Sequence, residues 1–133
     1  MKIINRIVKW NKERQLDKQS FDIKTETTNI LEELIEAQSK FINSDKARKL
    51  ANQVYGFIQI PEEKNEKNIV DAFADIIVYA IGSILKLGYN PIDVMDEVLK
   101  EIESRTGTII DGKFIKDKNA ITYKANFNKC KRR

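Results

Sequence analysis

Histidine is absent from this chain of 133 residues, and cysteine, tryptophan and proline are scarce. The single cysteine, Cys130, excludes a disulfide within the chain and fits a reducing cytosol. The first residues lead into an amphipathic segment rather than a continuous apolar run, so we expect no secretion signal and a cytoplasmic location. The length fits a single domain over residues 1–133, with a helical core over about 1–105 and a basic C-terminal segment over 106–133.

Charge is distributed unevenly along the chain. Eight basic residues and one acidic residue lie after position 112, so this segment carries +7 and residues 1–112 carry −3 of the total of +4. Such an asymmetry suggests a polyanionic partner. The tail lacks regularly interleaved aromatic residues, which makes nucleic acid the weaker choice of partner. For the last four residues we expect a solvated, partly disordered tail.

The longest apolar run extends from Ile69 to Leu87, and its single glycine and lack of proline predict a helix. Because it is apolar nearly all round, we expect a central, buried helix. Asp71, Asp75 and Tyr79 recur every four residues, which places the two carboxylates on adjacent turns, roughly 5–6 Å apart at Cβ. Burying them unpaired would be costly, so a lysine, an arginine or a metal ion is expected to face them. The run is long enough to cross a membrane, but the two aspartates and Lys86 favour a core helix.

The rest of the chain also reads as mostly helical. Asp111-Gly112 predicts a short hairpin between Thr108 and Ile115, followed by an extended or irregular segment from Lys116. The sequence thus predicts an all-α protein, a bundle of four to five helices with a short irregular or hairpin-like basic tail. The helices expected besides the central one cover residues 3–15, about Asp22 or Thr25 to Phe41, 46–57 and 91–104.

A second acidic cluster lies on the helix predicted before Phe41. Glu32, Glu33 and Glu36 share or flank one face of it. Antiparallel packing of this helix on the central one would bring the two acidic clusters together. Four oxygen donors in a chain without histidine suit Mg²⁺ or Mn²⁺. The alternative for each cluster is a solvated acidic face or ion pairs with neighbouring lysines.

The two acidic helices resemble those of the all-α nucleoside triphosphate pyrophosphatases, a superfamily that includes MazG, the dimeric dUTPases and phosphoribosyl-ATP pyrophosphatase. The resemblance covers about residues 26–105. It is carried by Glu32-Glu33-Leu34-Ile35-Glu36 and by Asp71-Ala72-Phe73-Ala74-Asp75. The family's second motif is commonly E-x-x-D, which has an acid where this chain has Ala72, and the chain instead matches the D-A-x-x-D variant of some members. The preferred base and sugar are not readable from these motifs.

The resemblance implies hydrolysis of a nucleoside triphosphate between its α and β phosphates, giving a monophosphate and pyrophosphate. It implies a site in which carboxylates hold Mg²⁺ and basic groups bind the outer phosphates. Glu33, Glu36 and Asp75 would be the core metal ligands, with Glu32 and Asp71 as further ligands or as the general base. The resemblance also implies a catalytic role for Glu33, as for Glu32 and Asp71. The phosphate-binding candidates are Arg105, Lys113, Lys116 and Lys124.

A nucleotide pocket needs an aromatic side chain, and the candidates for contact with the base are Trp10, Gln19 and Tyr79. Glu97 and Glu101, on the last predicted helix, are expected to be surface charges. Few helices in a short chain leave apolar faces incompletely covered, and relatives form dimers or tetramers, so we expect a homodimer or homotetramer. Two other classes remain open. One is a helical protein that binds nucleic acid or a partner through its basic tail, and the other is a metal-free helical scaffold.

Overall fold

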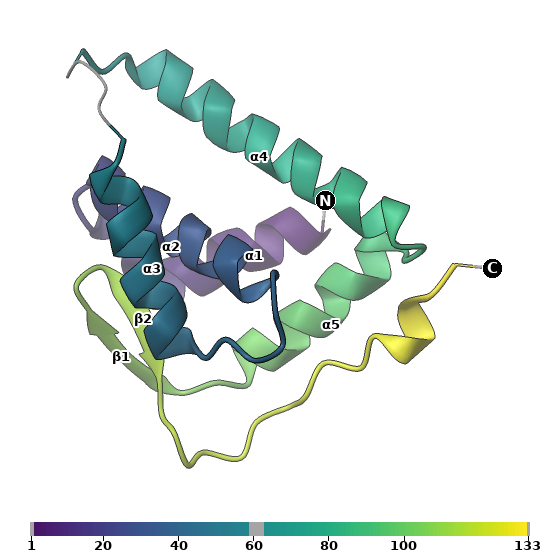
Figure 1. Cartoon of the computed structure of the whole chain (residues 1–133). Helices are drawn as coiled ribbons and strands as arrows, with labels where there is room; N and C mark the ends of the chain where they lie inside the picture. The colour runs from purple at the N-terminus through teal and green to yellow at the C-terminus, as the bar shows by residue number, and fades with distance from the viewer. Residues whose placement is uncertain (1, 59–62, 133) are drawn as a thin grey trace.

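The computed structural model describes residues 2–58 and 63–132, and within these ranges the chain is mostly helical, as predicted (Figure 1). The α-helices are α1 (Lys2–Glu13), α2 (Ile23–Glu36), α3 (Ser44–Gly56), α4 (Glu66–Lys86) and α5 (Pro91–Glu103). After them come two short strands, β1 (Gly107–Ile110) and β2 (Lys113–Lys116). Two 3₁₀ helices, η1 (Leu16–Lys18) and η2 (Asn128–Cys130), complete the described elements.

Side-chain caps set the starts of four helices close to where the sequence predicts them. In each case a carboxylate or amide oxygen accepts a backbone N–H of the first turn, which would otherwise lack a partner. The end of α2 was predicted at Phe41, and this is wrong, because the helix ends at Glu36. Beyond that point the Ser39 hydroxyl accepts the amide of Phe41 at 3.1 Å and holds a local turn instead. The four caps are Asp22, Asn43, Asn65 and Asn90.

The hairpin predicted at Asp111-Gly112 is confirmed. β1 and β2 pair antiparallel with Ile110 opposite Lys113, so the two residues between them form the whole turn. Asp111 has a φ of 50° and Gly112 a φ of 73°, the left-handed geometry that a two-residue hairpin turn requires. The hairpin presents Lys113 and Phe114 to the helices.

Two helix pairs form the body of the protein. α2 packs along α3, where Ala47 and Ala51 are fully buried and allow close approach. α1 packs on α5, where Arg6 bonds Asp96 at 2.7 Å and the indole N–H of Trp10 donates to the Ile102 carbonyl at 3.2 Å. The sequence predicts each of these four helices, but it does not predict which of them pack together.

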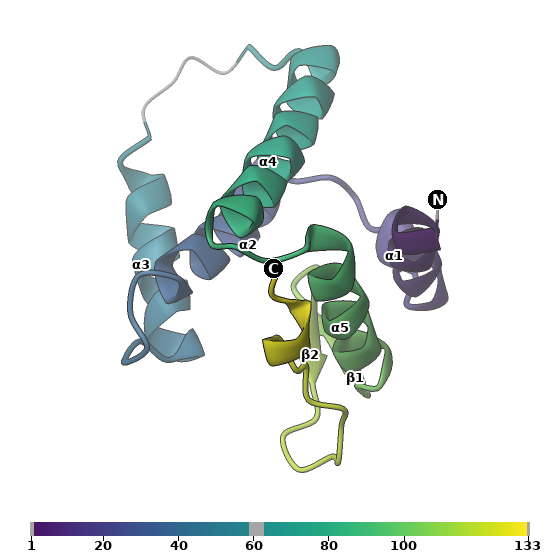
Figure 2. The same ribbon diagram turned by 90° about the vertical axis from the view of Figure 1, so that its right-hand side faces the viewer.

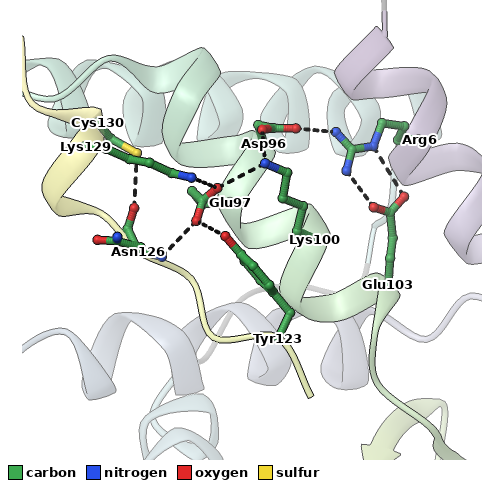
Figure 3. A network of polar contacts seen from close by, with 9 residues as sticks. All are labelled: Arg6, Asp96, Glu97, Lys100, Glu103, Tyr123, Asn126, Lys129 and Cys130. Carbon is green, nitrogen blue, oxygen red and sulfur yellow. Dashed lines mark hydrogen bonds and ion pairs between the residues drawn. The ribbon is translucent and has the colours of Figure 1, made fainter. Parts of the chain in front are cut away.

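A buried carboxylate attaches the C-terminal segment to α5 (Figure 3). Glu97 is only 1% exposed, so the expectation of a surface charge is wrong. It accepts the Tyr123 hydroxyl at 2.6 Å and the Asn126 backbone N–H at 2.9 Å, and it pairs with Lys129 and Lys100. These hydrogen bonds, that of Tyr123 foremost, lower the pKa of Glu97 to about 2.

Backbone hydrogen bonds hold residues 130–132, and the prediction of a solvated tail is wrong for Cys130, whereas Lys131 and Arg132 are exposed as expected. Cys130 is buried, and its carbonyl accepts the Asn90 N–H at 2.8 Å. The Arg132 N–H donates to the Gly88 carbonyl, also at 2.8 Å. Both bonds lie at the connection between α4 and α5. Arg133 lies outside the described residues.

Helix α4 differs most from its prediction. It has the predicted position and length, but none of its residues is buried, and Tyr79 is 78% exposed. It lies apart from the other helices and joins α5 at its C-terminal end (Figures 1 and 2). Along its length Phe73 meets the ring of Phe21, with centroids 6.4 Å apart. The expected cover is missing because α2 packs with α3 instead. By length and composition alone, α4 would also qualify as a membrane span.

We predict that Glu97→Gln weakens the docking of residues 123–132 on α5, because an amide accepts these hydrogen bonds less strongly than a carboxylate. The pKa of Glu97 in the folded chain, about 2, lies below its ordinary value of 4.5. Its stabilising effect is therefore complete above about pH 4.5 and is lost as the pH falls toward 2. The amide exchange protection factors of residues 123–132, which take account of the intrinsic rate at each pH, should fall at pH 7 in Glu97→Gln, and in the unaltered chain they should fall only on acidification. Glu13→Gln alters an exposed side chain and should leave the protection of residues 123–132 unchanged. Equal protection in the Glu97→Gln and Glu13→Gln variants would contradict the role of Glu97 in docking this segment.

Candidate functional site

A cavity of about 720 Å³ opens between α1, η1, α2, the end of α5 and the hairpin turn. Its volume lies in the range of small-molecule sites in proteins. Its lining combines aromatic, amide, acidic and basic side chains, so one ligand could contact side chains of all four kinds. The lining residues are Trp10, Asn11, Leu16, Gln19, Ser20, Asp22, Thr25, Glu26, Asn29, Ile30, Glu33, Ile102, Arg105, Asp111, Gly112, Lys113 and Phe114.

Five residues singled out from the sequence line this one cavity. They are Trp10 from α1, Gln19 after η1, Glu33 from α2, Arg105 after α5 and Lys113 from β2. Their roles were predicted as base contact, metal ligand and phosphate binding. The fold thus brings residues that are far apart in the sequence to the walls of a single cavity.

The aromatic wall of the cavity is held in place by Arg14. Trp10 and Phe114 meet edge to face with centroids 5.4 Å apart, and the Arg14 guanidinium lies 4.4 Å from the centre of the indole ring. Arg14 also bonds the backbone carbonyl of Arg105 at 3.4 Å, which connects this wall to the end of α5. Sequence reasoning missed Phe114. Its position two residues after the Asp-Gly turn is the signal that could have pointed to it.

The acidic side of the cavity is electrostatically strained. Desolvation raises the pKa of Glu33, and the charges of Glu36 and Glu32 raise it further, while Lys113 and Arg105 partly offset them. An added cation would relieve this crowding of carboxylates. Glu36 is half-buried on the same helix but does not line the cavity.

Glu32 lies in a buried ion pair between α2 and the hairpin. Its side chain is only 5% exposed, it is paired with Lys113, and the Arg48 guanidinium lies 3.9 Å away. Arg48 in turn donates to the Asn29 side chain at 2.7 Å. Sequence reasoning missed Arg48. The signal was the small, buried Ala47 beside it, which marks the face of α3 that meets α2. The catalytic role assigned to Glu32 stays a prediction.

Arg105 is oriented by a carboxylate expected at the surface. The two oxygens of Glu101 accept the Arg105 guanidinium at 2.9 Å and the Ala125 backbone N–H at 3.1 Å. Glu101 is therefore a half-buried link between the cavity and the C-terminal segment, and the expectation of a plain surface charge is wrong for it as well.

Other predicted residues lie outside the cavity. Asp71, Asp75 and Tyr79 are exposed on α4, and Lys116 and Lys124 are exposed near the C-terminal segment. Over residues 2–58 and 63–132, no three or more acidic or cysteine side chains gather closely enough to hold a metal ion. The expected packing of the two acidic helices on each other is therefore not present within the described chain.

We predict that Lys113→Met lowers the free energy of unfolding by about 1–3 kcal/mol, because it leaves the buried Glu32 carboxylate without its closest cation. Glu32→Gln in the same chain should recover much of this loss, and urea denaturation of the four combinations measures the coupling. Lys116→Met, on the same strand but without an ion pair in the described structure, is the matched control and should stay within about 0.5 kcal/mol. If the losses of stability caused by Lys113→Met and Glu32→Gln simply add in the double variant, the pairing of these two residues is contradicted.

No protein-family model matches this chain, and neither a curated protein nor a solved structure matches it significantly. The residues that line the cavity and the acidic motifs of α2 and α4 are therefore the features of this chain that bear on its function.

Proposed function

We propose that this chain is a metal-dependent nucleoside triphosphate pyrophosphohydrolase of the cytoplasm that acts as a homo-oligomer. The reaction would cleave a nucleotide between its α and β phosphates and release a monophosphate and pyrophosphate. The observation that carries the proposal is the single cavity in which an acidic residue, two cations and an aromatic wall face each other.

The lining of the cavity suits both parts of a nucleotide. Trp10 and Phe114 offer an aromatic surface for a base, and Gln19 and Asn29 offer amides that can both donate and accept. Arg105 offers a planar guanidinium, which binds phosphate oxygens in pairs. Contacts to the base and to the phosphates together would fix the substrate in the cavity.

The acidic residues fit a hard divalent cation. Mg²⁺ is usually held by one or two carboxylates together with substrate phosphates and water, and Glu33 and Glu36 supply such a pair. Desolvation raises the pKa of Glu33, the charges of Glu36 and Glu32 raise it further, and a bound cation would favour its charged form. When bound, the ion would supply charge neutralisation at the phosphates and a lower pKa for a bound water.

Each protein side chain then has a distinct task. Glu33 and Glu36 would hold the cation, and Arg105, whose guanidinium Glu101 orients, would bind phosphate oxygens. Lys113 is paired with Glu32, so its ammonium can turn toward a phosphate only while it stays next to that carboxylate. Asp71 and Asp75 complete the ligand set in this proposal, although they lie on α4, away from the cavity.

The competing nucleic-acid hypothesis gains little support from the tail. Several of its cations are used inside the molecule: Lys129 pairs with Glu97, Lys131 lies over the Tyr89 ring and Arg132 bonds the Leu85 carbonyl. We therefore put forward no second function. Salt-sensitive binding to DNA or RNA without nucleotide turnover would favour that alternative.

We predict that the purified chain releases pyrophosphate from at least one canonical or deoxy nucleoside triphosphate in Mg²⁺ or Mn²⁺, and that EDTA abolishes the release. Glu36→Gln and Asp75→Asn should each lower kcat at least about 100-fold while the far-ultraviolet circular dichroism stays unchanged. Chromatographic detection of monophosphate plus pyrophosphate measures the reaction.

Glu66→Gln is the matched control, because it removes a carboxylate from the first turn of the same helix as Asp75. This variant should keep turnover within about twofold. Full activity in both Glu36→Gln and Asp75→Asn would refute the metal-site assignment. Absence of turnover on every nucleotide, together with a melting temperature that Mg²⁺ does not change, would favour the metal-free scaffold.

A further inference from the structure

Helix α4 is too apolar to stay uncovered along its whole length. It has 21 residues, so it is about 30 Å long, and none of them is buried. Val78 is 66% exposed, and Ile77 beside it is 60% exposed. A contiguous apolar surface of this extent on a soluble protein marks an interaction site.

The C-terminal end of α4 is attached to the end of the chain. The Arg132 side chain donates to the Leu85 carbonyl at 3.0 Å, and the Arg132 backbone N–H donates to the Gly88 carbonyl at 2.8 Å. On the α5 side the Asn90 N–H is bound by the Cys130 carbonyl. These bonds hold the end of the chain at the corner between α4 and α5, from which α4 extends (Figure 2).

The pair of α2 and α3 also carries exposed apolar side chains. Leu34 is exposed near the end of α2, and Val54 and Phe57 are exposed at the end of α3, Phe57 by 84%. Leu34 follows Glu33, which lines the cavity. Each chain thus has an apolar helix without cover and apolar side chains on α2 and α3 that also lack cover.

We propose that two copies of this chain pair symmetrically, with α4 of each lying on the α2–α3 face of the other, so that the partner's Asp71 and the partner's Asp75 complete the metal site of Glu33 and Glu36. This inference rests on the proposed function. It names the second chain as part of the site and explains why the described part of a single chain does not gather its acidic residues.

A second copy fits α4 better than other occupants do. In a two-fold pair each chain gives and receives a strip about 30 Å long and about 10 Å wide, and the two strips together amount to about 600 Å² per chain, the lower end of the range for a stable interface. A lipid bilayer would cover α4, but it would place Asp71 and Asp75 in hydrocarbon and leave Leu34 and Phe57 exposed. The acidic pair instead requires a polar site beneath it.

A mixed dimer tests whether the site is shared. Glu36→Gln and Asp75→Asn chains with different affinity tags are co-expressed, and dimers that contain one of each are isolated. If the partner supplies Asp75, one of the two sites in the mixed dimer has no substitution, and about half of the wild-type turnover returns. If both acidic pairs come from one chain, every site has one substitution and no turnover returns.

The outcomes separate this inference from the proposed function. An active wild-type protein whose mixed dimer stays inactive overturns the shared site and leaves the reaction standing. If no nucleotide is turned over, Mn²⁺ binding followed by electron paramagnetic resonance replaces the activity assay. One bound ion per mixed dimer, against two per wild-type dimer, supports the shared site, and none per mixed dimer overturns it. Wild-type protein that neither turns over nucleotides nor binds Mn²⁺ contradicts both proposals.

Sedimentation tests the interface itself. The wild-type chain should sediment as a dimer at micromolar concentration, and Ile77→Asp should shift it to monomer with unchanged helicity, because Ile77 touches solvent in the single chain. Ile121→Asp is the matched control: Ile121 is a fully exposed apolar residue of the C-terminal segment, and this variant should stay dimeric. A wild-type monomer that floats with phosphatidylcholine vesicles would overturn the proposal in favour of a lipid surface.

Discussion

The buried carboxylate of Glu97 connects α5 to side chains and backbone 26 or more residues later in the chain. It gathers the Tyr123 hydroxyl, the Asn126 backbone and the Lys129 ammonium, and so keeps the C-terminal segment against α5. An unpaired charge at this depth would be strongly unfavourable, so the segment and the carboxylate require each other. The end of the segment, from Cys130 to Arg132, then reaches the corner between α4 and α5 and closes it with backbone hydrogen bonds.

A strongly apolar helix nevertheless stands away from the body (Figure 1). The body builds its cavity from α1, α2, α5 and the hairpin, with Glu101 and Glu32 setting the positions of Arg105 and Lys113. α4 contributes none of the cavity lining, although it has the most apolar sequence of any described helix and two of the expected metal ligands. A second chain accounts for both facts at once, because it would cover the apolar surface and deliver the missing carboxylates.

Local features were predictable from the sequence, and pairings between distant elements were not. Asp22 and Asn65 cap helices where their side chains allow it, and Asp111-Gly112 turns as its φ preferences require, because such effects act within a few residues. Periodicity also identified α4, but an apolar helix looks the same whether its own chain or another chain covers it. Glu97 resembled a surface charge because its partners lie about 30 residues away, and the sequence does not show that Tyr123 meets it.

For the candidate site, too, the sequence predicts which residues have suitable chemistry but not which of them the fold brings together. Trp10, Arg105 and Lys113 were chosen as aromatic or basic residues that suit a nucleotide, and the fold places all three on one cavity. Lys116 and Lys124 have the same chemistry but lie elsewhere, because strand register and the path of the tail decide which lysine faces inward. Arg48 and Phe114 join the site through the helix pair and the hairpin, and in the sequence only a neighbouring feature, Ala47 or the Asp-Gly turn, points to each of them.

The most direct measurement is a crystal structure grown with Mn²⁺ and a non-hydrolysable nucleoside triphosphate analogue, using the anomalous signal of the metal. The account predicts Mn²⁺ next to the Glu33 and Glu36 carboxylates of one copy and the Asp75 carboxylate of its partner, with the base against Trp10 and Phe114. A lattice in which the analogue is absent from this cavity and no metal lies at Glu33 and Glu36 would contradict it.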